Sequence, residues 1–339
     1  MSRLINFLVN LRAMPGRVEA LARLPVRIAN LEKKIERLNG KNLTSGESGD
    51  APSPTIANTS AAPAAIDASG RSAPGATNST STADVEAAKA AFNEYLGLLL
   101  NRPLASQTYG CRCCGKEIDL SAREPLDATC FISGLSLRRY KCPHCSVVFG
   151  PVQLIECSGE ELGRVYELLY GFLHEGDSRI GQEKAFYCTD PGFSERILNY
   201  ACGDWDSGLA RLRDIGWNVE GYEPFQPNSS PHIYAHRDDV PQKAYDALFS
   251  HNYLEHVQDP LAFFSECLDY IHPDGRMAHS TPCYSYVFEQ SPLHLHFVLP
   301  DTVLALAENT GLTVSGHFAS DLDSEHTNIH FECYVFKLK

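Results

Sequence analysis

The stretch Arg196–Pro224 constrains the fold of this 339-residue chain more than any other segment. A short apolar run ending at Leu198 predicts a buried strand, and the small residues Ala201–Gly203 predict a turn. A helical spacing of leucines follows, and Val219–Tyr222 predicts a second strand that ends at Glu223. This order of elements predicts a nucleoside-binding α/β unit with its ligand at the carboxyl ends of the strands.

Three classes of ligand suit such a unit, and the glycines distinguish among them. The dinucleotide fingerprint needs three glycines, but Ala201 and Asp206 stand at the first and third positions. Gly203 and Gly208 have the spacing of a phosphate-binding loop, but no lysine follows. S-adenosylmethionine needs only a looser turn because it has no pyrophosphate. A βαβ unit without a ligand is the structural alternative.

The next segment, Tyr245–Pro260, reads YDALFSHNYLEHVQDP. Together with Arg196–Pro224 it resembles the class I S-adenosylmethionine-dependent methyltransferases, in which a strand, a Leu-Glu-His segment and an Asp-Pro helix start follow in this order. The match runs over Arg196 to Val314. The resemblance implies an α/β fold: a Rossmann-like sheet with helices on both faces and an antiparallel last strand.

The resemblance also implies which residues hold the cofactor. Glu223 would bind the ribose hydroxyls, and one of Asp238 and Asp239, with a slight preference for Asp238, would meet the adenine amino group. Asn199 and Ala201 depart from the family, which usually has an acid and a glycine there, so a methyltransferase fold without turnover is an alternative. The expected cofactor residues are Asn199, Ala201, Cys202, Gly203, Glu223, Asp238, His251 and Asn252.

Methyl transfer requires an acceptor aligned with the methyl group, and a poor nucleophile such as a sugar hydroxyl also needs a general base. The candidates are His256 of the Leu-Glu-His segment, and His294 and His296, which would point to the same side of an extended segment. A metal bound by the latter pair would lack an evident third ligand. The structural alternative is that His256 only stabilises the backbone at the start of a helix.

Two CxxC pairs predict a structural zinc site. Cys111 and Cys114 form the first pair, and Cys142 and Cys145 form the second, with 27 residues between the pairs. Four thiolates with this spacing can surround zinc tetrahedrally and leave no position open for catalysis. Cys113 is the rival ligand in the first pair.

A zinc ribbon followed by a helix with Glu-Glu-Leu, here Glu160–Leu162, resembles a recurring bacterial group of methyltransferases. That group is commonly associated with methylation of sugars, polysaccharides or small metabolites. The resemblance therefore implies a sugar, a glycan precursor or another small metabolite as substrate, and a role in polysaccharide biosynthesis. A binding or scaffold protein of a glycan-assembly complex is the alternative.

Composition divides the chain into segments. Apolar residues recur at steps of three and four in the N-terminal segment, which predicts a coiled coil for self-association, with contact to an anionic membrane surface as an alternative. The expected segments are a helical or coiled-coil segment (1–39), a disordered linker (40–82), a helix (83–105), the zinc ribbon (106–155), a helical connection (156–190) and the methyltransferase domain (191–339).

Charge and cysteine content limit location and partners. The net charge of −13 disfavours a nucleic-acid substrate. No apolar run approaches the ~18 residues of a membrane span, and cysteines in CxxC pairs indicate a reducing compartment. We expect a cytoplasmic enzyme, with a peripheral position at the inner face of the membrane as an alternative.

Overall fold

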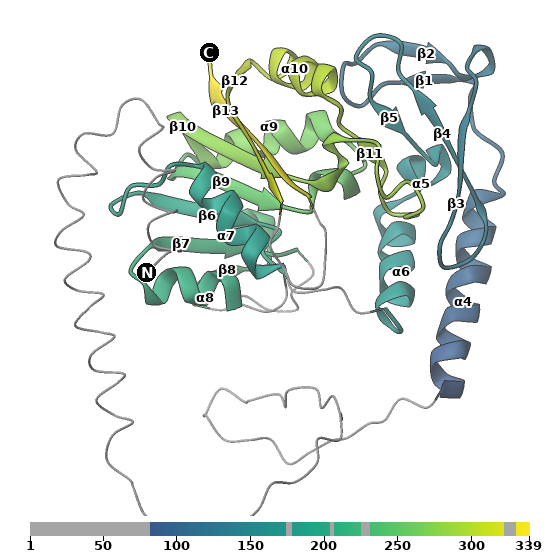
Figure 1. Cartoon of the computed structure of the whole chain (residues 1–339), viewed down its shortest axis with the longest axis horizontal. Coiled ribbons are helices and arrows are strands. Elements are labelled where there is room, and N and C mark those ends of the chain that lie inside the picture. The colour runs from purple at the N-terminus through teal and green to yellow at the C-terminus, as the bar shows by residue number, and fades with distance from the viewer. Residues whose placement is uncertain (1–81, 174–177, 204–206, 225–230, 322–329) are drawn as a thin grey trace, which may run out of the picture. The chain divides into compact units, whose positions relative to one another are not determined.

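The computed structural model describes residues 82–173, 178–203, 207–224, 231–321 and 330–339 (Figure 1). The chain divides into two units, Met1–Thr77 and Asn78–Lys339, and the described residues all belong to the second. The expected coiled coil (1–39) and linker (40–82) lie outside the described residues, except for Thr82.

A seven-stranded mixed sheet forms the centre of the larger unit (Figure 1). The strand order is β12-β13-β10-β9-β6-β7-β8. The strands from β6 to β10 run parallel, whereas β13 runs antiparallel to both of its neighbours. This arrangement confirms the predicted fold. The strands are β6 (Arg196–Tyr200), β7 (Asn218–Tyr222), β8 (Ile233–Tyr234), β9 (Tyr245–His251), β10 (Ile271–Ser280), β12 (Leu312–Asp321) and β13 (His330–Leu338).

Helices cover both faces of this sheet because successive strand residues point to opposite sides. Ile197 of β6 packs in one hydrophobic cluster with α7 and α8, and Leu198 packs in another with α9 and α10. The side chain of Asp259 caps the start of α9 by accepting a hydrogen bond from the Ala262 N–H at 3.0 Å. The helices are α7 (Arg179–Cys188), α8 (Ser207–Asp214), α9 (Pro260–Tyr270) and α10 (Pro300–Asn309).

The cysteine-rich segment forms two small antiparallel sheets (Figure 1). One consists of β1 (Thr108–Gly110) and β2 (Glu117–Asp119), and the other has the order β11-β5-β4-β3. β11 comes from far along the chain, and His296 pairs with Phe149 of β5. The ribbon sheet is therefore completed by the methyltransferase part. The remaining strands are β3 (Leu126–Thr129), β4 (Ser136–Lys141), β5 (Val148–Phe149) and β11 (His296–Phe297).

Three helices flank the ribbon: α4 (Thr82–Leu100) precedes it in the chain, and α5 (Val152–Glu156) and α6 (Gly159–Tyr170) follow it before the large sheet. Ser158 and Glu161 form a reciprocal capping box that fixes the start of α6. Buried residues of α4, the ribbon, α6 and the sheet belong to one continuous hydrophobic cluster. The ribbon also contacts α9, where Leu261 N–H donates to the Arg112 carbonyl at 3.1 Å.

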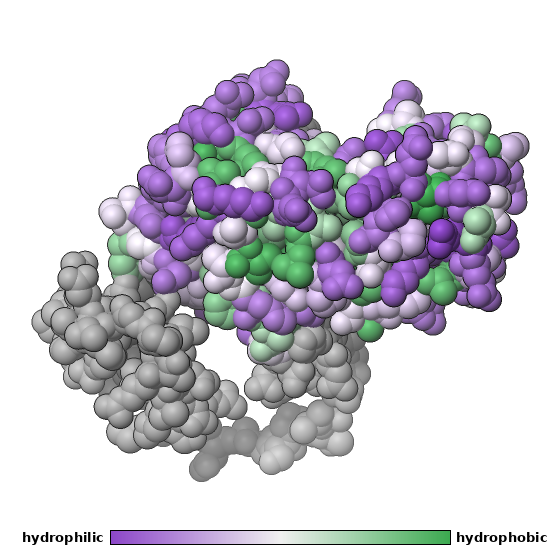
Figure 2. Space-filling model, turned by 90° about the horizontal axis from the view of Figure 1, so that it is seen from above, coloured by the Kyte–Doolittle hydropathy of each residue, from purple (hydrophilic) through white to green (hydrophobic). Residues whose placement is uncertain are grey.

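The surface seen from above is mostly hydrophilic, with separate hydrophobic areas between the polar side chains (Figure 2). Among the described residues, no helix combines the length and the apolar character needed to span a membrane.

Candidate functional site

The four predicted zinc ligands lie together. The thiols of Cys111, Cys114, Cys142 and Cys145 are buried, and their sulfur atoms all lie within 4.8 Å of one another. Cys111 Sγ is 3.7 Å from Cys145 Sγ, and Cys114 Sγ is 3.8 Å from Cys142 Sγ. A regular tetrahedron with zinc–sulfur bonds of about 2.3 Å places sulfur atoms about 3.8 Å apart. The residues therefore fit a structural zinc ion.

The two halves of this cluster repeat one backbone pattern. The carbonyl of Cys111 accepts a hydrogen bond from Gly115 N–H at 2.8 Å, and the carbonyl of Cys142 accepts one from Ser146 N–H at 3.0 Å. Gly115 and Ser146 both have positive φ, 72° and 65°. Cys113 is buried beside the cluster but is not one of the four gathered thiols. The same backbone turn thus presents two of the four thiols from each half of the cluster.

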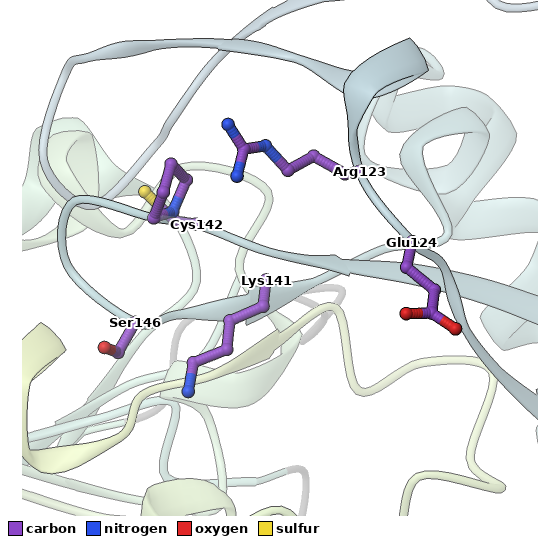
Figure 3. Close-up of a pocket in the computed structure, with 6 residues that line it drawn as sticks. Arg123, Glu124, Lys141, Cys142 and Ser146 are labelled. Atoms are coloured by element: carbon purple, nitrogen blue, oxygen red, sulfur yellow. The ribbon is translucent and has the colours of Figure 1, made fainter.

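A surface pocket of about 400 Å³ lies beside the second pair (Figure 3). The side chain of Arg123 points toward the backbone at Cys142 (Figure 3). Cys142 itself has no exposed surface, so the pocket does not open the thiol cluster to solvent. Its lining residues are Arg123, Glu124, Lys141, Cys142, Pro143 and Ser146.

The predicted cofactor turn follows β6 and touches the end of β7. Gly203 N–H donates to Glu223 Oε2 at 2.8 Å, and Cys202 N–H donates to the Tyr222 carbonyl at 3.2 Å. Ala201 has φ of 55°, a left-handed conformation that favours glycine and costs an alanine about 1 kcal/mol. Ala201 thus adopts the conformation that a glycine would favour at this position.

Asn199 supports this turn from the face of the sheet that α7 covers. It is buried, and its Nδ2 donates to Gln182 Oε1 of α7 at 3.1 Å. Gln182 Nε2 in turn lies 3.3 Å from the Cys202 carbonyl, to which it donates. Asn199 Oδ1 is buried without a hydrogen-bond partner among the described residues. Asn199 and Gln182 together hold the turn through side-chain amides.

The other predicted cofactor residues lie at different depths. Asp238 is exposed on a short 3₁₀ turn, Arg237–Asp239 (η2). Asn252 is exposed with φ of 52°. His251 instead packs beneath α7, where a Cβ on Gly181 would lie 2.0 Å from its Nε2. Burial lowers the pKa of His251 to about 4, so the ring is neutral at physiological pH.

A cavity of about 330 Å³ lies between α6 and α9, next to the cofactor turn. Tyr200, which directly precedes Ala201, lines it and donates its hydroxyl proton to Glu266 Oε1 at 2.9 Å. Tyr166 and Tyr253 were not among the predicted site residues, but they line the same cavity. The lining residues are Gly159, Leu162, Gly163, Tyr166, Tyr200, Tyr253, His256, Val257, Gln258, Asp259, Ala262, Phe263 and Glu266.

His256 is the one predicted base that lines this cavity. It lies on the 3₁₀ turn Leu254–His256 (η3), and its Nδ1 is 3.0 Å from the Leu293 carbonyl. A carbonyl can only accept, so Nδ1 carries the proton and Nε2 keeps its lone pair. The Leu293 contact therefore sets the tautomer that a general base at Nε2 requires.

The structure places His294 and His296 in different surroundings. His294 lies 5.1 Å from His256 between ring centroids, and its Nδ1 is 3.3 Å from Cys283 Sγ. Burial, followed by the nearby His256 and Arg139, holds the pKa of His294 well below its usual value. His296 is buried, with Nδ1 3.0 Å from the Val257 carbonyl. The structure thus groups His294 with His256 and not with His296.

Part of the chain matches a known protein family. Residues 172–321 match a family model described as a methyltransferase domain. No curated protein sequence matches the chain.

Solved structures with related folds come from several organisms. A Burkholderia thailandensis 1,6-didemethyltoxoflavin-N1-methyltransferase is 11% identical with a TM-score of 0.43, covering 64% of this chain and 100% of that one. An S-adenosylmethionine-dependent methyltransferase of Mesorhizobium loti is 18% identical with a TM-score of 0.34, covering 46% and 97%. One of Methanosarcina mazei is 9% identical with a TM-score of 0.34, covering 45% and 97%.

The family match spans the cofactor turn, the Leu-Glu-His segment and all three candidate histidines. Residues 172–321 are therefore a methyltransferase domain, which uses S-adenosylmethionine as its methyl donor.

Proposed function

We propose that the chain methylates a hydroxyl group of a sugar, glycan precursor or other small metabolite held in the cavity between α6 and α9. One observation carries this proposal: the cavity lies beside the cofactor turn at Tyr200 and holds His256 in the tautomer of a general base. A cavity of about 330 Å³ is at the small end of the range for small-molecule sites, which suits a monosaccharide unit better than a macromolecule.

The lining of the cavity supports a polyhydroxylated acceptor. Tyr166 and Tyr253 are half-buried, so each offers a flat apolar ring with a polar tip. Glu266 accepts hydrogen bonds from the hydroxyls of Tyr200 and Tyr270, at 2.9 and 3.0 Å. A ring that is apolar on its faces and hydroxylated at its rim would find matching surfaces here.

The chemistry assigned to this chain is positioning and proton removal. S-adenosylmethionine, when bound, supplies a methyl group activated by the sulfonium. Glu223 and the turn Ala201–Gly203 would hold the nucleoside, with Asn199, Cys202, Asp238, His251 and Asn252 as the further predicted contacts. His256 Nε2 would take the hydroxyl proton as the oxygen forms its bond to the methyl carbon and the sulfur–carbon bond breaks. The zinc held by the four thiols would be structural.

A scaffold that binds without turnover is the second candidate. The contact that favours it is the one between Gly203 N–H and Glu223 Oε2, which engages the carboxylate expected to bind ribose. The predicted cytoplasmic location, and the self-association or membrane contact of residues 1–39, stay predictions.

Transfer of a radioactive methyl group to a panel of sugars and nucleotide sugars tests the proposal. We expect turnover with at least one hydroxylated acceptor and a fall in kcat of about 100- to 10,000-fold in His256→Gln, with unchanged S-adenosylmethionine affinity. His272→Gln, at an exposed histidine of β10, is the matched control and should retain activity. Cofactor binding without transfer to any acceptor would favour the scaffold.

A further inference from the structure

Three side chains from separate segments meet next to His256 of the cavity, two of them buried and the third, that of His294, half-buried. Glu255 comes from η3, Cys283 from the 3₁₀ turn Pro282–Tyr284 (η4) and His294 from the loop before β11. One ligand atom from each lies within 4.8 Å of the other two. Glu255 and Cys283 are 1% and 0% exposed. Such a set of oxygen, sulfur and nitrogen donors is unusual in an apolar core.

We propose that Glu255, Cys283 and His294 bind a second divalent metal ion, preferentially zinc, with its fourth position directed toward His256 and the acceptor cavity. The catalytic role of this ion rests on the proposed function, whereas its binding to the three residues does not. Zinc accepts thiolate, imidazole and carboxylate ligands together, and catalytic zinc sites commonly have three protein ligands and one open position.

The distances suit an ion at the centre of the three donors. His294 Nδ1 is 3.3 Å from Cys283 Sγ. With bonds of about 2.0–2.3 Å, tetrahedral ligand atoms lie about 3.3–3.8 Å apart.

The cavity reaches this cluster at His256. Its Nε2 lies 4.0 Å from Glu255 Oε1, and its Nδ1 is occupied by the Leu293 carbonyl. An acceptor hydroxyl at the fourth position would be acidified by the ion, and His256 Nε2 would take its proton. Glu255 and Cys283, which are buried, would thereby act on the substrate through the ion that they hold.

The charge of such an ion would equal that of its two anionic ligands. Glu255 and a Cys283 thiolate supply two negative charges, equal to the charge of one divalent cation. The neighbouring guanidinium is that of Arg139, which is fully buried and donates to the Ser291 carbonyl at 2.7 Å. It also lies 3.4 Å from the His294 carbonyl, so Arg139 fixes the backbone that carries the ligand.

Metal content of the purified full-length chain, measured by mass spectrometry after zinc loading and desalting, tests the proposal. We expect two zinc ions per chain in the wild type and one in Cys283→Ser and in His294→Gln. Cys267→Ser is the matched control because Cys267 is equally buried in α9 but lies outside the cluster. It should retain both ions.

Cobalt replacement distinguishes the two sites without relying on mutant folding. Charge-transfer absorption from sulfur to cobalt should show a four-thiolate site and a second, weaker one-thiolate site in the wild type. A wild type with only the four-thiolate spectrum and one ion per chain would overturn the proposal, leaving a plain thiol–imidazole hydrogen bond. Zinc content that is unchanged in Cys283→Ser would also overturn it.

The two proposals can fail separately. A second ion without methyl transfer to any acceptor would support the metal site and count against the proposed function. Methyl transfer by a chain that holds only the ribbon ion would support the function and refute the metal site.

Discussion

The ribbon and the carboxyl edge of the large sheet both bury polar side chains, but they do so in different ways. In the ribbon, four identical thiols come from two similar backbone turns and surround one point, with Sγ–Sγ distances of 3.7 and 3.8 Å. At the sheet edge, Glu223 follows β7, whereas Glu255 and His256 follow β9, and each has different partners.

This difference separates stability from chemistry. A closed set of identical ligands has no free position, so its metal can stabilise the fold but cannot bind a substrate. A mixed set at the ends of several strands leaves groups directed at a cavity, as in other α/β proteins. Substitutions in the ribbon should therefore act on folding, whereas those at the sheet edge should act on binding, catalysis or local packing.

The largest expected effect is loss of the ribbon metal. Cys142→Ser or a strong chelator should lower the Tm by about 10 °C or more, because a structural zinc ion contributes several kcal/mol to folding. The large sheet should be affected too, since β5 pairs with β11. Differential scanning calorimetry with zinc analysis measures both.

Cys113→Ser is the matched control for this prediction. Its thiol is buried beside the cluster but is not one of the four ligands, so the variant should keep its zinc and lose about 1–3 kcal/mol at most. Equal zinc loss in the two variants would show that Cys113 is a ligand and that the four-thiol assignment is wrong.

The next effect concerns His279 of β10, which is buried among Phe263, Phe264 and Phe336. Burial lowers its pKa to about 3. Below pH 6.5 the unfolded chain gains a proton that the folded chain does not bind, so stability is full above pH 6.5 and falls as the pH decreases. Between pH 6.5 and 5 this amounts to about 2 kcal/mol.

Urea unfolding of the wild type and of His279→Asn at pH 7.5 and 5.0 measures this contribution. The variant cannot take up the proton, so its free energy of unfolding should fall less on acidification, by about 2 kcal/mol. Effects common to both proteins, such as protonation of the ribbon thiolates, cancel in the difference. Parallel losses in the two proteins would mean that His279 titrates normally in the fold.

An effect of similar size in free energy is expected for cofactor binding. Glu223→Gln should weaken S-adenosylmethionine binding about 10- to 100-fold, because hydrogen bonds to a charged group contribute about 1.5–3 kcal/mol. Isothermal titration of the full chain measures this. Asp214→Asn removes the same charge from an exposed site at the end of α8 and should leave the affinity unchanged. Equal affinities in all three proteins would remove Glu223 from the cofactor site.

The sequence predicted those parts of the molecule in which neighbours in the chain act together. The turn Ala201–Gly203 and the two CxxC pairs are local patterns, and the fold prediction followed from them. The grouping of Glu255, Cys283 and His294 was not predictable, because it depends on how three segments pack. His294 was paired with His296 on strand spacing, but the structure provides only the two-residue strand β11 there, and His294 precedes it.

The sequence predicted a helical connection over 156–190 without bounds for α7 inside it, and the residues of α7 explain why. Gly181 has low helix propensity, and Gln182 is a buried polar residue on the face that should be apolar. Both serve the site: Gly181 makes room for His251, and Gln182 bonds to Asn199. The apolar periodicity that identifies a helix is therefore interrupted where α7 contacts the predicted cofactor residues Asn199 and His251.

Gly181→Ala should change the free energy of unfolding least, and whether it stabilises or destabilises the protein is the informative result. Helix propensity alone would stabilise the variant by up to about 1 kcal/mol, but the new Cβ would lie 2.0 Å from His251 Nε2, and overpacking costs about 1–3 kcal/mol. We expect a net loss of about 1–2 kcal/mol in urea unfolding. Gly163→Ala in α6 is the control, since its Cβ would have no neighbour within 4 Å, and it should stabilise by about 0.5–1 kcal/mol. Stabilisation of both variants would show that α7 does not press on His251, and the histidine would then be free to turn toward the cofactor as the sequence predicts.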